Sequence, residues 1–485
     1  MLVSEKIQPQ IEISFTQSLC PVCLKVLSAS LVKIGEEIHI RRQCPEHGLF
    51  SEPIWRGRPL FDTWHRPKGS AKGVPVNRPS IKGCPYDCGL CPSHSQHPCT
   101  ILLEITSRCD LMCSVCFASS GGLNSTHRDF ELLKKDLKII KAQAPRVVLQ
   151  LSGGEPSLHP NLIELVYEAA SIFPGVQLNT NGLNLAKDKS LARELKKAGL
   201  KWVFLQFDSL NDEVYRLLRG RALVETKLKA LENLEAAKLP AVLVPTVVRG
   251  LNHGELGELI RLAASKAWLR GVHFQPMTAS GRNSFLGPQY RLTLPELLTL
   301  LQEQGCGTID IDKAFPPGCE HERCSFHLRF RRLNDGTLIP KTALASSNCC
   351  SEGANDKSAP LESQDGQSRD RAVDIILRSW APGQNTEPTP IKPSTPKSFT
   401  PKPLIPLYVK KKDAFDEFLE NAARETFSLT AMFFQDAWSI DLERLEGCCV
   451  HIFAPPDRFV PFCAMNLTSA DGQALHRGHR ETLEP

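Results

Sequence analysis

The sequence lacks the features of a membrane or secreted protein. No apolar run in its 485 residues reaches the ~18 that a membrane-spanning helix needs, and the start, Met1–Lys6, has no signal-peptide pattern. A net charge of +5 is too small and too dispersed to indicate a nucleic-acid partner. These absences predict a cytoplasmic protein that has no transmembrane segment and binds no nucleic acid.

The composition is ordinary except for cysteine. Hydrophobic residues make up 41% and charged residues 23%, as in globular proteins, and the length allows one large barrel with small appendages. The chain nevertheless carries 18 cysteines. Because thiols rarely form disulfides in a reducing compartment, cysteines clustered in this number indicate metal sites.

The most informative cysteines are Cys109, Cys113 and Cys116, which share one short loop. The apolar run 100–105 before them predicts a buried strand, so the thiols follow its C-terminal end, where α/β barrels keep their chemistry. Four cysteines saturate a [4Fe–4S] cluster, and three therefore leave one iron open for another ligand. Three free thiols, or a zinc site that lacks a ligand, are the alternatives.

Residues 1–65 are predicted to form a small metal-knuckle domain. Its ligands would be two pairs of residues, each pair closely spaced: Cys20 with Cys23, and Cys44 with His47. Four sulfur and nitrogen ligands complete a tetrahedral site and leave no open position, which predicts a structural role. Zinc is the expected ion and a rubredoxin-like iron its competitor, while two unrelated pairs are the alternative.

Residues 66–99 begin as a linker rich in proline, glycine and basic residues and end in a second cysteine cluster. Four cysteines this close together are typical of a complete [4Fe–4S] site, and the nearby three-cysteine loop favours an auxiliary cluster. A zinc site is the alternative, and His94 or His97 can replace a cysteine as ligand. The predicted ligands are Cys84, Cys88, Cys91 and Cys99.

Residues 100–280 alternate between strand-like apolar runs and stretches of helical period. Six such βα repeats predict an α/β fold, a parallel sheet curved into a partial (β/α)6 TIM-like barrel; an open doubly wound sheet is the alternative. The expected strands are 100–105, 146–151, 176–179, 201–207, 241–248 and 271–275. The expected helices are 129–142, 162–171, 191–197, 226–238 and 255–267.

Polar residues follow several of these strands. Glycines after the second strand allow a close backbone approach, and Glu155 can accept hydrogen bonds from an ammonium group. The other polar side chains at strand ends are candidate cofactor or substrate ligands, although helix caps are an equal alternative. The predicted cofactor-binding residues are Ser152, Gly153, Gly154, Glu155, Pro156, Asn179, Asn181, Gln206, Asp208 and Gln275.

Beyond the barrel the chain is expected to divide into three further parts. Residues 281–341 extend the barrel, residues 342–406 form a low-complexity, flexible insertion with an amphipathic piece at 371–380, and residues 407–485 are compact again. Cys319 and Cys324, with two of Cys448, Cys449 and Cys463, are candidates for a second auxiliary cluster. The ligand set we predict is Cys319, Cys324, Cys449 and Cys463.

The order of these motifs resembles the radical S-adenosylmethionine (SAM) superfamily. CPYDCGLC, CDLMCSVCF, SGGEP and LQFDSL occur in series, and DAWSIDLERLEGCCVH follows near the end. Within that superfamily the series looks like the subfamily that includes archaeal tetraether lipid synthase and the radical SAM pterin methylase of methanopterin biosynthesis. The resemblance covers about residues 15–340 and 410–470.

The resemblance implies a cofactor set and a reaction. SAM would bind the open iron of the loop cluster, with Gly153, Gly154 and Glu155 holding its methionyl end, and one electron would cleave it to a 5′-deoxyadenosyl radical. That radical would abstract hydrogen from an unactivated carbon, for carbon–carbon coupling of lipid chains or for methylation of a pterin-like ring. A reductant such as ferredoxin or flavodoxin is implied, and a lipid substrate would add peripheral membrane contact.

Other functions remain open at this point. A peptide-modifying maturase with auxiliary clusters is one alternative, and an iron–sulfur scaffold or electron carrier is a second that would not cleave SAM. A lipid substrate would need a long apolar groove. Six phenylalanines near the C-terminus can line such a groove or form an ordinary core, and the core is favoured: Phe427, Phe433, Phe434, Phe453, Phe459 and Phe462.

Overall fold

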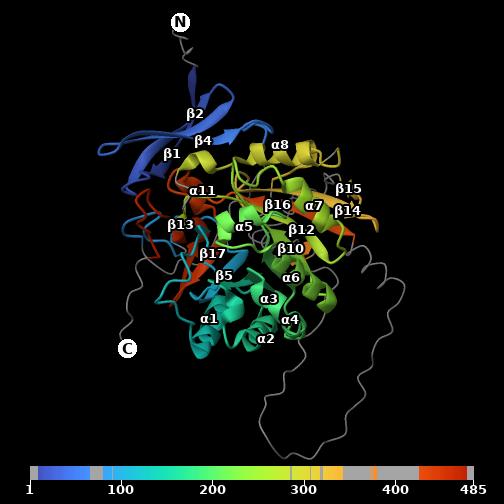
Figure 1. The fold of residues 1–485 in the computed structure, drawn as a ribbon. Helices are drawn as coiled ribbons and strands as arrows, with labels where there is room; N and C mark the ends of the chain where they lie inside the picture. Colours follow the sequence, from blue (N-terminus) through green and yellow to red (C-terminus); the bar gives the residue numbers. More distant parts are fainter. Residues whose placement is uncertain are drawn as a thin grey trace, which may run out of the picture.

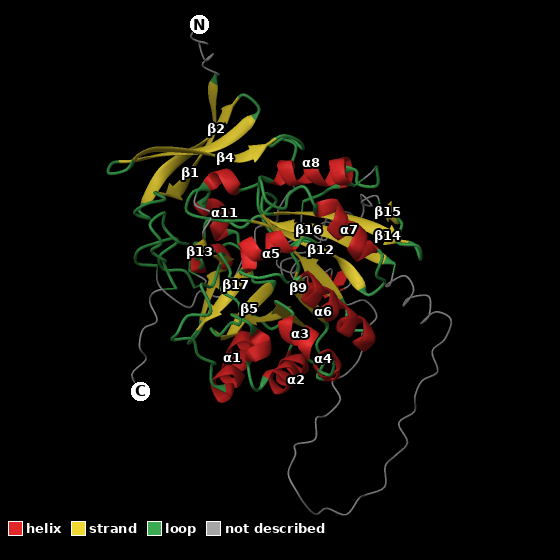
Figure 2. Ribbon diagram, viewed as in Figure 1, coloured by secondary structure: helices red, strands yellow, loops and turns green. Residues whose placement is uncertain are grey.

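A computed structural model shows a small N-terminal sheet resting on a large barrel-like body (Figures 1 and 2). Ten ranges of the chain are described: 9–65, 80–89, 91–283, 287–305, 307–316, 320–341, 373–374, 376–377, 379–380 and 425–477. Cys319, most of the linker at 66–82 and most of the insertion at 342–406 lie outside them.

Six parallel strands form the centre of the body, which confirms the predicted α/β barrel. They pair in the order in which they occur along the chain, and their inward-facing side chains surround a cavity. The strands are β5 (Thr100–Thr106), β7 (Val148–Gly153), β8 (Gly175–Thr180), β9 (Trp202–Gln206), β10 (Ala241–Val244) and β12 (Leu269–Pro276), with the short β11 (Thr246–Val247) beside β12.

Helices cover the outer face of these strands (Figure 1). Local caps set their ends: the Asp129 side chain accepts from the Leu132 amide at the start of the first helix, and Gly220, at φ 83°, ends the fifth. The helices are α1 (Phe130–Gln143), α2 (Leu162–Ile172), α3 (Leu183–Lys187), α4 (Leu191–Lys197), α5 (Asp212–Arg219), α6 (Val224–Ala237) and α7 (Leu256–Ala264).

The C-terminal segment adds a strand to each edge of the barrel sheet. Strand β16 (Thr426–Met432) pairs in parallel with β12, and β17 (Val450–Ala454) pairs in parallel with β5. The described part of residues 407–485 therefore shares the barrel's sheet. Antiparallel strands follow outside: β14 (Ser325–Arg332) and β15 (Leu338–Pro340) beyond β16, and β18 (Arg458–Pro461) beyond β17.

A helical piece of the insertion closes the bottom of the barrel. Val373 and Trp380 are buried against Val148, Trp202 and Val242, whose side chains form the lowest layer of the barrel interior. An ion pair between Arg146 and Asp374 adds to this attachment. The predicted amphipathic piece at 371–380 thus has its described part packed inside the barrel.

The N-terminal sheet is an antiparallel meander of β1 (Gln10–Leu19), β2 (Val26–Ile34), β3 (Glu37–Cys44) and β4 (Gly48–Arg56). It docks on the loop between β16 and α11 (Leu442–Glu446). The buried Arg42 guanidinium donates to the carbonyl oxygens of Ala437 (3.1 Å) and Trp438 (2.9 Å), and Thr16 donates to Asp441 (2.7 Å). Hydrogen bonds to this loop, together with ion pairs from Glu52 and Arg56 of β4 to Arg291 and Glu296, therefore fix the sheet to the body.

The remaining elements are short or peripheral. Helix α8 (Leu294–Gln304), which contacts β4, starts with a capping box between Thr293 and Glu296. The others are β6 (Val115–Cys116), β13 (Arg282–Asn283), α12 (Phe462–Met465) and three short 3₁₀ helices, η1 (Pro156–Leu158), η2 (Pro288–Tyr290) and η3 (Ile311–Lys313).

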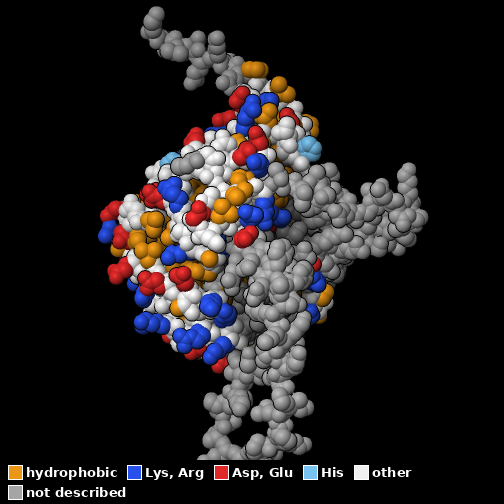
Figure 3. Space-filling view, turned by 90° about the vertical axis from the view of Figure 1, so that its right-hand side faces the viewer, with side chains coloured by type: hydrophobic (Ala, Val, Ile, Leu, Met, Phe, Trp, Pro, Cys, Tyr) orange, Lys and Arg blue, Asp and Glu red, His pale blue; other side chains and the backbone are white. Residues whose placement is uncertain are grey.

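The surface agrees with the dispersed charge of the sequence. Lys and Arg side chains occur alongside Asp and Glu on the described part of the face in Figure 3. Among the described helices, none is both long and apolar enough to cross a bilayer.

Candidate active site and metal centres

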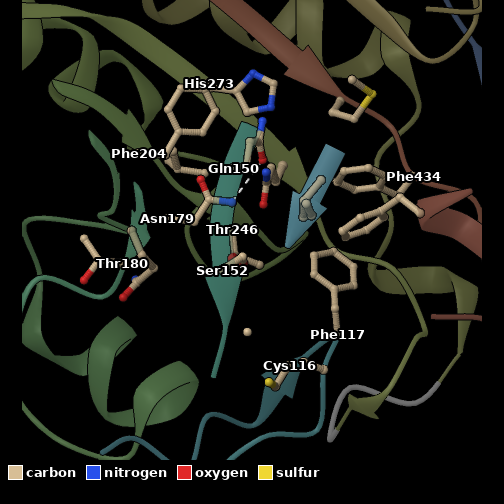
Figure 4. Close-up of a pocket in the computed structure, with 18 of the residues that line it drawn as sticks. Cys116, Phe117, Gln150, Ser152, Asn179, Thr180, Phe204, Thr246, His273 and Phe434 are labelled. Carbon is tan, nitrogen blue, oxygen red and sulfur yellow. Dashed lines mark hydrogen bonds between the residues drawn. The ribbon is translucent and has the colours of Figure 1, made fainter. Parts of the chain in front are cut away.

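The main cavity has a volume of about 330 Å³ and extends from the C-terminal ends of the barrel strands into the barrel interior, where Ile376 and Trp380 also line it. Cys109, Cys113 and Cys116 all line it, together with the Gly153–Glu155 turn. In Figure 4, Cys116 lies at one end of the cavity and His273 at the other. The structure therefore brings the three-cysteine loop and the glycine–glutamate turn to a single site.

The cysteine loop is held by a segment that follows the barrel. Strand β6 of the loop pairs with β13, and Arg282 donates to the carbonyl oxygens of Cys113 (2.6 Å) and Ser120 (3.0 Å). A Cβ on Gly281 would lie 2.4 Å from the Cys116 carbonyl oxygen, so only glycine permits this approach. Arg282 and Gly281 thus clamp the loop through its backbone.

Thiols that face one cavity are a donor set suited to an iron–sulfur cluster. The described groups whose ligand atoms all lie within 4.8 Å do not include these three cysteines, so their spacing does not match that of a single ion. A cubane spreads its thiolates over a larger volume. Burial raises the pKa of the Cys109 thiol to about 12, which indicates that a cation is needed to hold it as thiolate.

The two glycines of the turn serve backbone packing. A Cβ on Gly153 would lie 2.2 Å from the Thr106 carbonyl oxygen, and one on Gly154 would lie 2.2 Å from that of Arg108. The Gly154 and Glu155 amides donate to these same oxygens, at 2.8 and 2.7 Å. The glycines therefore bring the turn against the start of the cysteine loop. Both also line the cavity, and their close approach to a ligand stays a prediction.

The Glu155 carboxylate is fully buried and already accepts three hydrogen bonds. Its donors are the Ser157 amide (2.9 Å), the Thr180 hydroxyl (2.6 Å) and the Asn181 amide (2.7 Å). Burial raises its pKa, and these bonds oppose that rise. The Ser157 hydroxyl also acts on this carboxylate, and the contact of Glu155 with an ammonium group stays a prediction.

Asp208 does not line the cavity, unlike the other polar residues predicted at the strand ends. It is fully buried, and its carboxylate binds the Arg219 guanidinium twice (2.7 and 2.8 Å) and the Thr246 amide (2.9 Å). Burial alone would lower the pKa of Arg219, but the charge of Asp208 raises it above its usual value. The part of Asp208 is to position Arg219, which lines the cavity and lies beside Cys113.

Of the remaining predicted cofactor-binding residues, all but Pro156 line the cavity. Ser152, Asn179, Asn181, Gln206 and Gln275 line the cavity, whereas Pro156 begins the 3₁₀ helix η1. The Asn181 side chain also donates to Asp110 in the cysteine loop (2.7 Å), and Gln206 accepts from the buried Lys227 (2.6 Å). Contacts of these residues with a cofactor stay predictions.

His273 gives the site a testable pH dependence. Its Nδ1 forms a hydrogen bond with the Thr430 hydroxyl (2.7 Å), and burial lowers the pKa of the imidazole to about 4. Between pH 6.5 and 4 the unfolded chain binds a proton at this position that the folded chain does not, so stability falls as the pH falls. We expect a loss of roughly 3 kcal/mol from this residue over that range.

Urea unfolding at several pH values between 7 and 4 measures this contribution. The variant His273→Gln should reduce the pH dependence, to which the buried His94 and His451 also contribute. His65→Gln, at an exposed position, should leave it as in the wild type. An unchanged slope in the His273 variant would contradict the assignment.

The N-terminal knuckles meet as predicted. The ligand atoms of Cys20, Cys23, Cys44 and His47 all lie within 4.8 Å of one another. The Cys44 sulfur is 3.4 Å from His47 Nδ1, and the Cys23 and Cys44 sulfurs are 4.0 Å apart. This donor set fits a single tetrahedral metal ion.

Replacing His47 by alanine is expected to empty this site. Three thiols remain as ligands, so the metal content of this site should fall from about one zinc per chain toward zero, and β1–β4 should become sensitive to protease. Elemental analysis and limited proteolysis measure both effects. His39→Ala on β3, away from the knuckles, is the control; a variant at position 47 that keeps its zinc would refute the assignment.

The other cysteines gather in two adjoining places. Cys84, Cys88 and Cys91 lie close enough for each to affect the pKa of a neighbour, and Cys448 also acts on Cys88. A smaller cavity is lined by Cys324, Cys448, Cys449 and Cys463.

Two contacts complicate the predicted ligand sets. The Cys99 sulfur lies 3.1 Å from that of Cys449, which joins members of different predicted clusters. His94 Nε2 donates to the Cys448 carbonyl oxygen (2.8 Å), so that nitrogen is occupied by the backbone. The division of these cysteines between clusters therefore stays a prediction, and Cys319 lies outside the described residues.

The fold and the cysteine loop together define a radical enzyme, and the chain belongs to the radical SAM superfamily. The model of that superfamily matches residues 103–263, and the HMPTM N-terminal zinc ribbon domain matches residues 12–56. Over 482 residues the chain is 31% identical to the 7,8-dihydro-6-hydroxymethylpterin dimethyltransferase of Methanocaldococcus jannaschii, an alignment that covers 93% of each chain. Membership implies an enzyme with a [4Fe–4S] cluster and SAM.

More distant relatives match only part of the chain. The GTP 3′,8-cyclase of Petrotoga mobilis is 27% identical over 261 residues, which are 49% of this chain and 79% of that one. The solved structure of Streptococcus suis SuiB bound to S-adenosylmethionine aligns with a TM-score of 0.38 and 15% identity, and covers 43% of this chain and 47% of that one.

Several site residues were not predicted from the sequence. Gln150 is an inward-facing polar residue inside an apolar strand, and that mismatch was the signal available. Arg219, Lys227 and Arg282 lie in helices or beyond the barrel, where nothing local marks them. Trp380 reaches the cavity from the insertion.

Proposed function

We propose that this protein is a radical SAM methylase whose substrate is a pterin-like heteroaromatic ring. One observation carries the proposal: the cavity beside the cysteine loop is lined by several side-chain amides, among them Gln150, Gln177 and Asn179, and Ile376 and Trp380 lie at its floor. A flat ring with several donors and acceptors matches such a lining. The similar dimethyltransferase, whose name specifies a hydroxymethylpterin, supports the same substrate class.

Aromatic rings on one side of the cavity support a flat substrate. Phe434 and Phe462 stack at 4.1 Å between ring centroids, and Phe117 packs edge-on against both, at 5.5 and 5.2 Å. Figure 4 shows Phe117 and Phe434 on the same side of the cavity. Such faces favour a planar ring over a flexible chain.

Lipid-chain coupling, the other outcome that the resemblance implied, has weaker support. Of the six C-terminal phenylalanines, Phe427, Phe433, Phe453 and Phe459 belong to the main core, as the favoured interpretation expected. Only Phe434 and Phe462 line the cavity, and Trp380 and Ile376 close its floor. The described lining also contains the amide side chains of Gln150, Gln177 and Asn179, so it is not purely apolar.

The chain's own residues position the cofactors and seal the site. When bound, the cluster and SAM supply the radical that abstracts hydrogen. Cys109, Cys113 and Cys116 would hold the cluster, and the Glu155 carboxylate, which lines the same cavity, would bind the SAM amino group. Trp380 at the floor keeps water out of the cavity, which protects a reactive carbon radical.

Pterin analysis in living cells tests the proposed substrate without a choice of methyl donor. The chain is expressed in an anaerobic bacterial host that makes hydroxymethylpterin, and extracted pterins are compared by mass. We expect pterins heavier by one or two methyl groups, which the triple alanine variant of the three loop cysteines should not produce. Unchanged pterins, together with newly coupled lipid chains, would reject the proposal.

We further propose that the other cysteines hold one or two auxiliary clusters and that a ferredoxin or flavodoxin supplies the electron. The surroundings of these cysteines support the clusters. The hydrogen bond with Cys84 and burial raise the pKa of Cys88, and burial raises the pKa values of Cys448 and Cys463, so a metal ion would be needed to hold these groups as thiolates. Anaerobic reconstitution should give about eight to twelve irons per chain. A content of only about four irons per chain would mean that the loop cluster is present and the auxiliary clusters are not.

A further inference from the structure

A row of hydrogen-bonded side chains crosses the inner face of the barrel. Trp202 Nε1 donates to Gln177 Oε1 at 2.8 Å, Gln177 donates to Asn179, and Asn179 Nδ2 donates to Gln150 Oε1 at 3.0 Å. The four residues come from the adjacent strands β9, β8 and β7. Trp202 and Gln177 are buried, so solvent does not compete for these bonds.

The chemistry of the first donor fixes the direction of the whole row. An indole N–H can only donate, so the Gln177 atom that meets Trp202 must be its oxygen. The other end of Gln177 is then its amino group, which requires the oxygen of Asn179. Asn179 in turn offers its amino group, which requires the oxygen of Gln150.

The row ends with the amino group of Gln150 facing the cavity. Gln150 lines the cavity, and among the described residues its amino group donates to none. Figure 4 shows the bond from Asn179 and places Gln150 near His273 and Phe204, which pack against each other at 5.4 Å. The cavity thus contains a donor whose polarity is set by a buried residue on another strand.

We propose that Gln150 determines substrate specificity by donating a hydrogen bond to the ring carbonyl oxygen of the substrate. Trp202 is the positioning residue that fixes this polarity through Gln177 and Asn179. The inference rests on the proposed function, because it takes a pterin-like ring as the ligand. A ring that carries an amino group in place of the carbonyl would oppose donor to donor and bind more weakly.

Two pteridines that differ at this one position test the proposal. Binding of 6-hydroxymethylpterin and of 2,4-diamino-6-hydroxymethylpteridine is measured by ligand fluorescence, on the reconstituted holoenzyme with SAM and without reductant. The wild type should prefer the carbonyl ligand by about tenfold or more. Gln150→Met should lose that preference, and the ratio of two affinities corrects for any partial loss of folded protein.

A variant that does not alter Gln150 gives the sharper result. In Asn179→Asp the carboxylate can no longer donate, so the Gln150 amide should turn its amino group toward Asp and its oxygen toward the cavity. The preference should then invert in favour of the diamino ligand. Trp202→Phe should reduce the preference, while Trp55→Phe, which removes an indole donor in the N-terminal sheet, should keep it.

The outcomes separate this inference from the proposed function. If the wild type binds neither pteridine, both are rejected. If it binds them but the Gln150 and Asn179 variants keep the wild-type preference, only the role of Gln150 is rejected. If those variants respond and Trp202→Phe does not, Trp202 does not set the polarity.

Discussion

Replacing Cys113 by alanine is expected to abolish SAM cleavage, with 5′-deoxyadenosine falling to the level of a protein-free control. Two thiols cannot hold a cubane that keeps one iron open, so the loss should be complete. The loop itself should persist, because Arg282 binds the carbonyl oxygen of Cys113 and not its sulfur. Anaerobic incubation with SAM and dithionite, followed by chromatography, gives the measurement.

The matched control is Cys463→Ala, on α12 in the smaller cavity that Cys324, Cys448 and Cys449 also line. It should lose iron but still cleave SAM, since the three-cysteine loop is intact. Circular dichroism should be the same for both variants. A Cys113 variant that forms 5′-deoxyadenosine at the wild-type rate would show that the loop does not hold the catalytic cluster.

Asp208→Ala is expected to cost about 3–5 kcal/mol of unfolding free energy, because it leaves the Arg219 guanidinium buried without its partner. Asp208 is fully buried and Arg219 is 6% exposed, so water cannot replace the lost carboxylate. Urea unfolding followed by tryptophan fluorescence measures the loss.

Two further variants show that the cost comes from the unpaired charge. Glu213→Ala breaks the exposed Glu213–Arg216 pair on the same helix α5 and should change stability by less than about 0.5 kcal/mol. The double variant Asp208→Leu with Arg219→Met removes both charges and should recover much of the loss. A loss below about 1 kcal/mol in Asp208→Ala would contradict the argument.

The barrel was predictable because its strands are local signals. Each of the six parallel strands is a short apolar run separated from the next by a helical stretch, so periodicity marks them without knowledge of partners. Strands β16 and β17 could not be placed in this way, since their partners lie far away in sequence. Cys99 and Cys449, which precede the paired strands β5 and β17, are 350 residues apart.

The same distinction between local signals and distant contacts holds for the residues of the site. Thiol ligands were recognised because metal binding imposes short spacings, as at Cys109–Cys116 and at the N-terminal knuckles. Asp208 was predicted as a ligand from its place after a strand, yet its partner Arg219 comes from the next helix and turns it away from the cavity. Gln150 and Trp202 act through contacts between different strands, and the spacing of residues along the sequence does not indicate such contacts.

The position of β17 also constrains the order of synthesis and folding. Its partner β5 leaves the ribosome early, whereas β17 is made after almost all of the chain. During translation β5 and β12 are therefore exposed sheet edges, open to aggregation until the last strands arrive. The same late segment packs beside the cysteine loop, where Phe434 and Phe462 contact Phe117, so this side of the loop is completed only when residues 425–477 have been made.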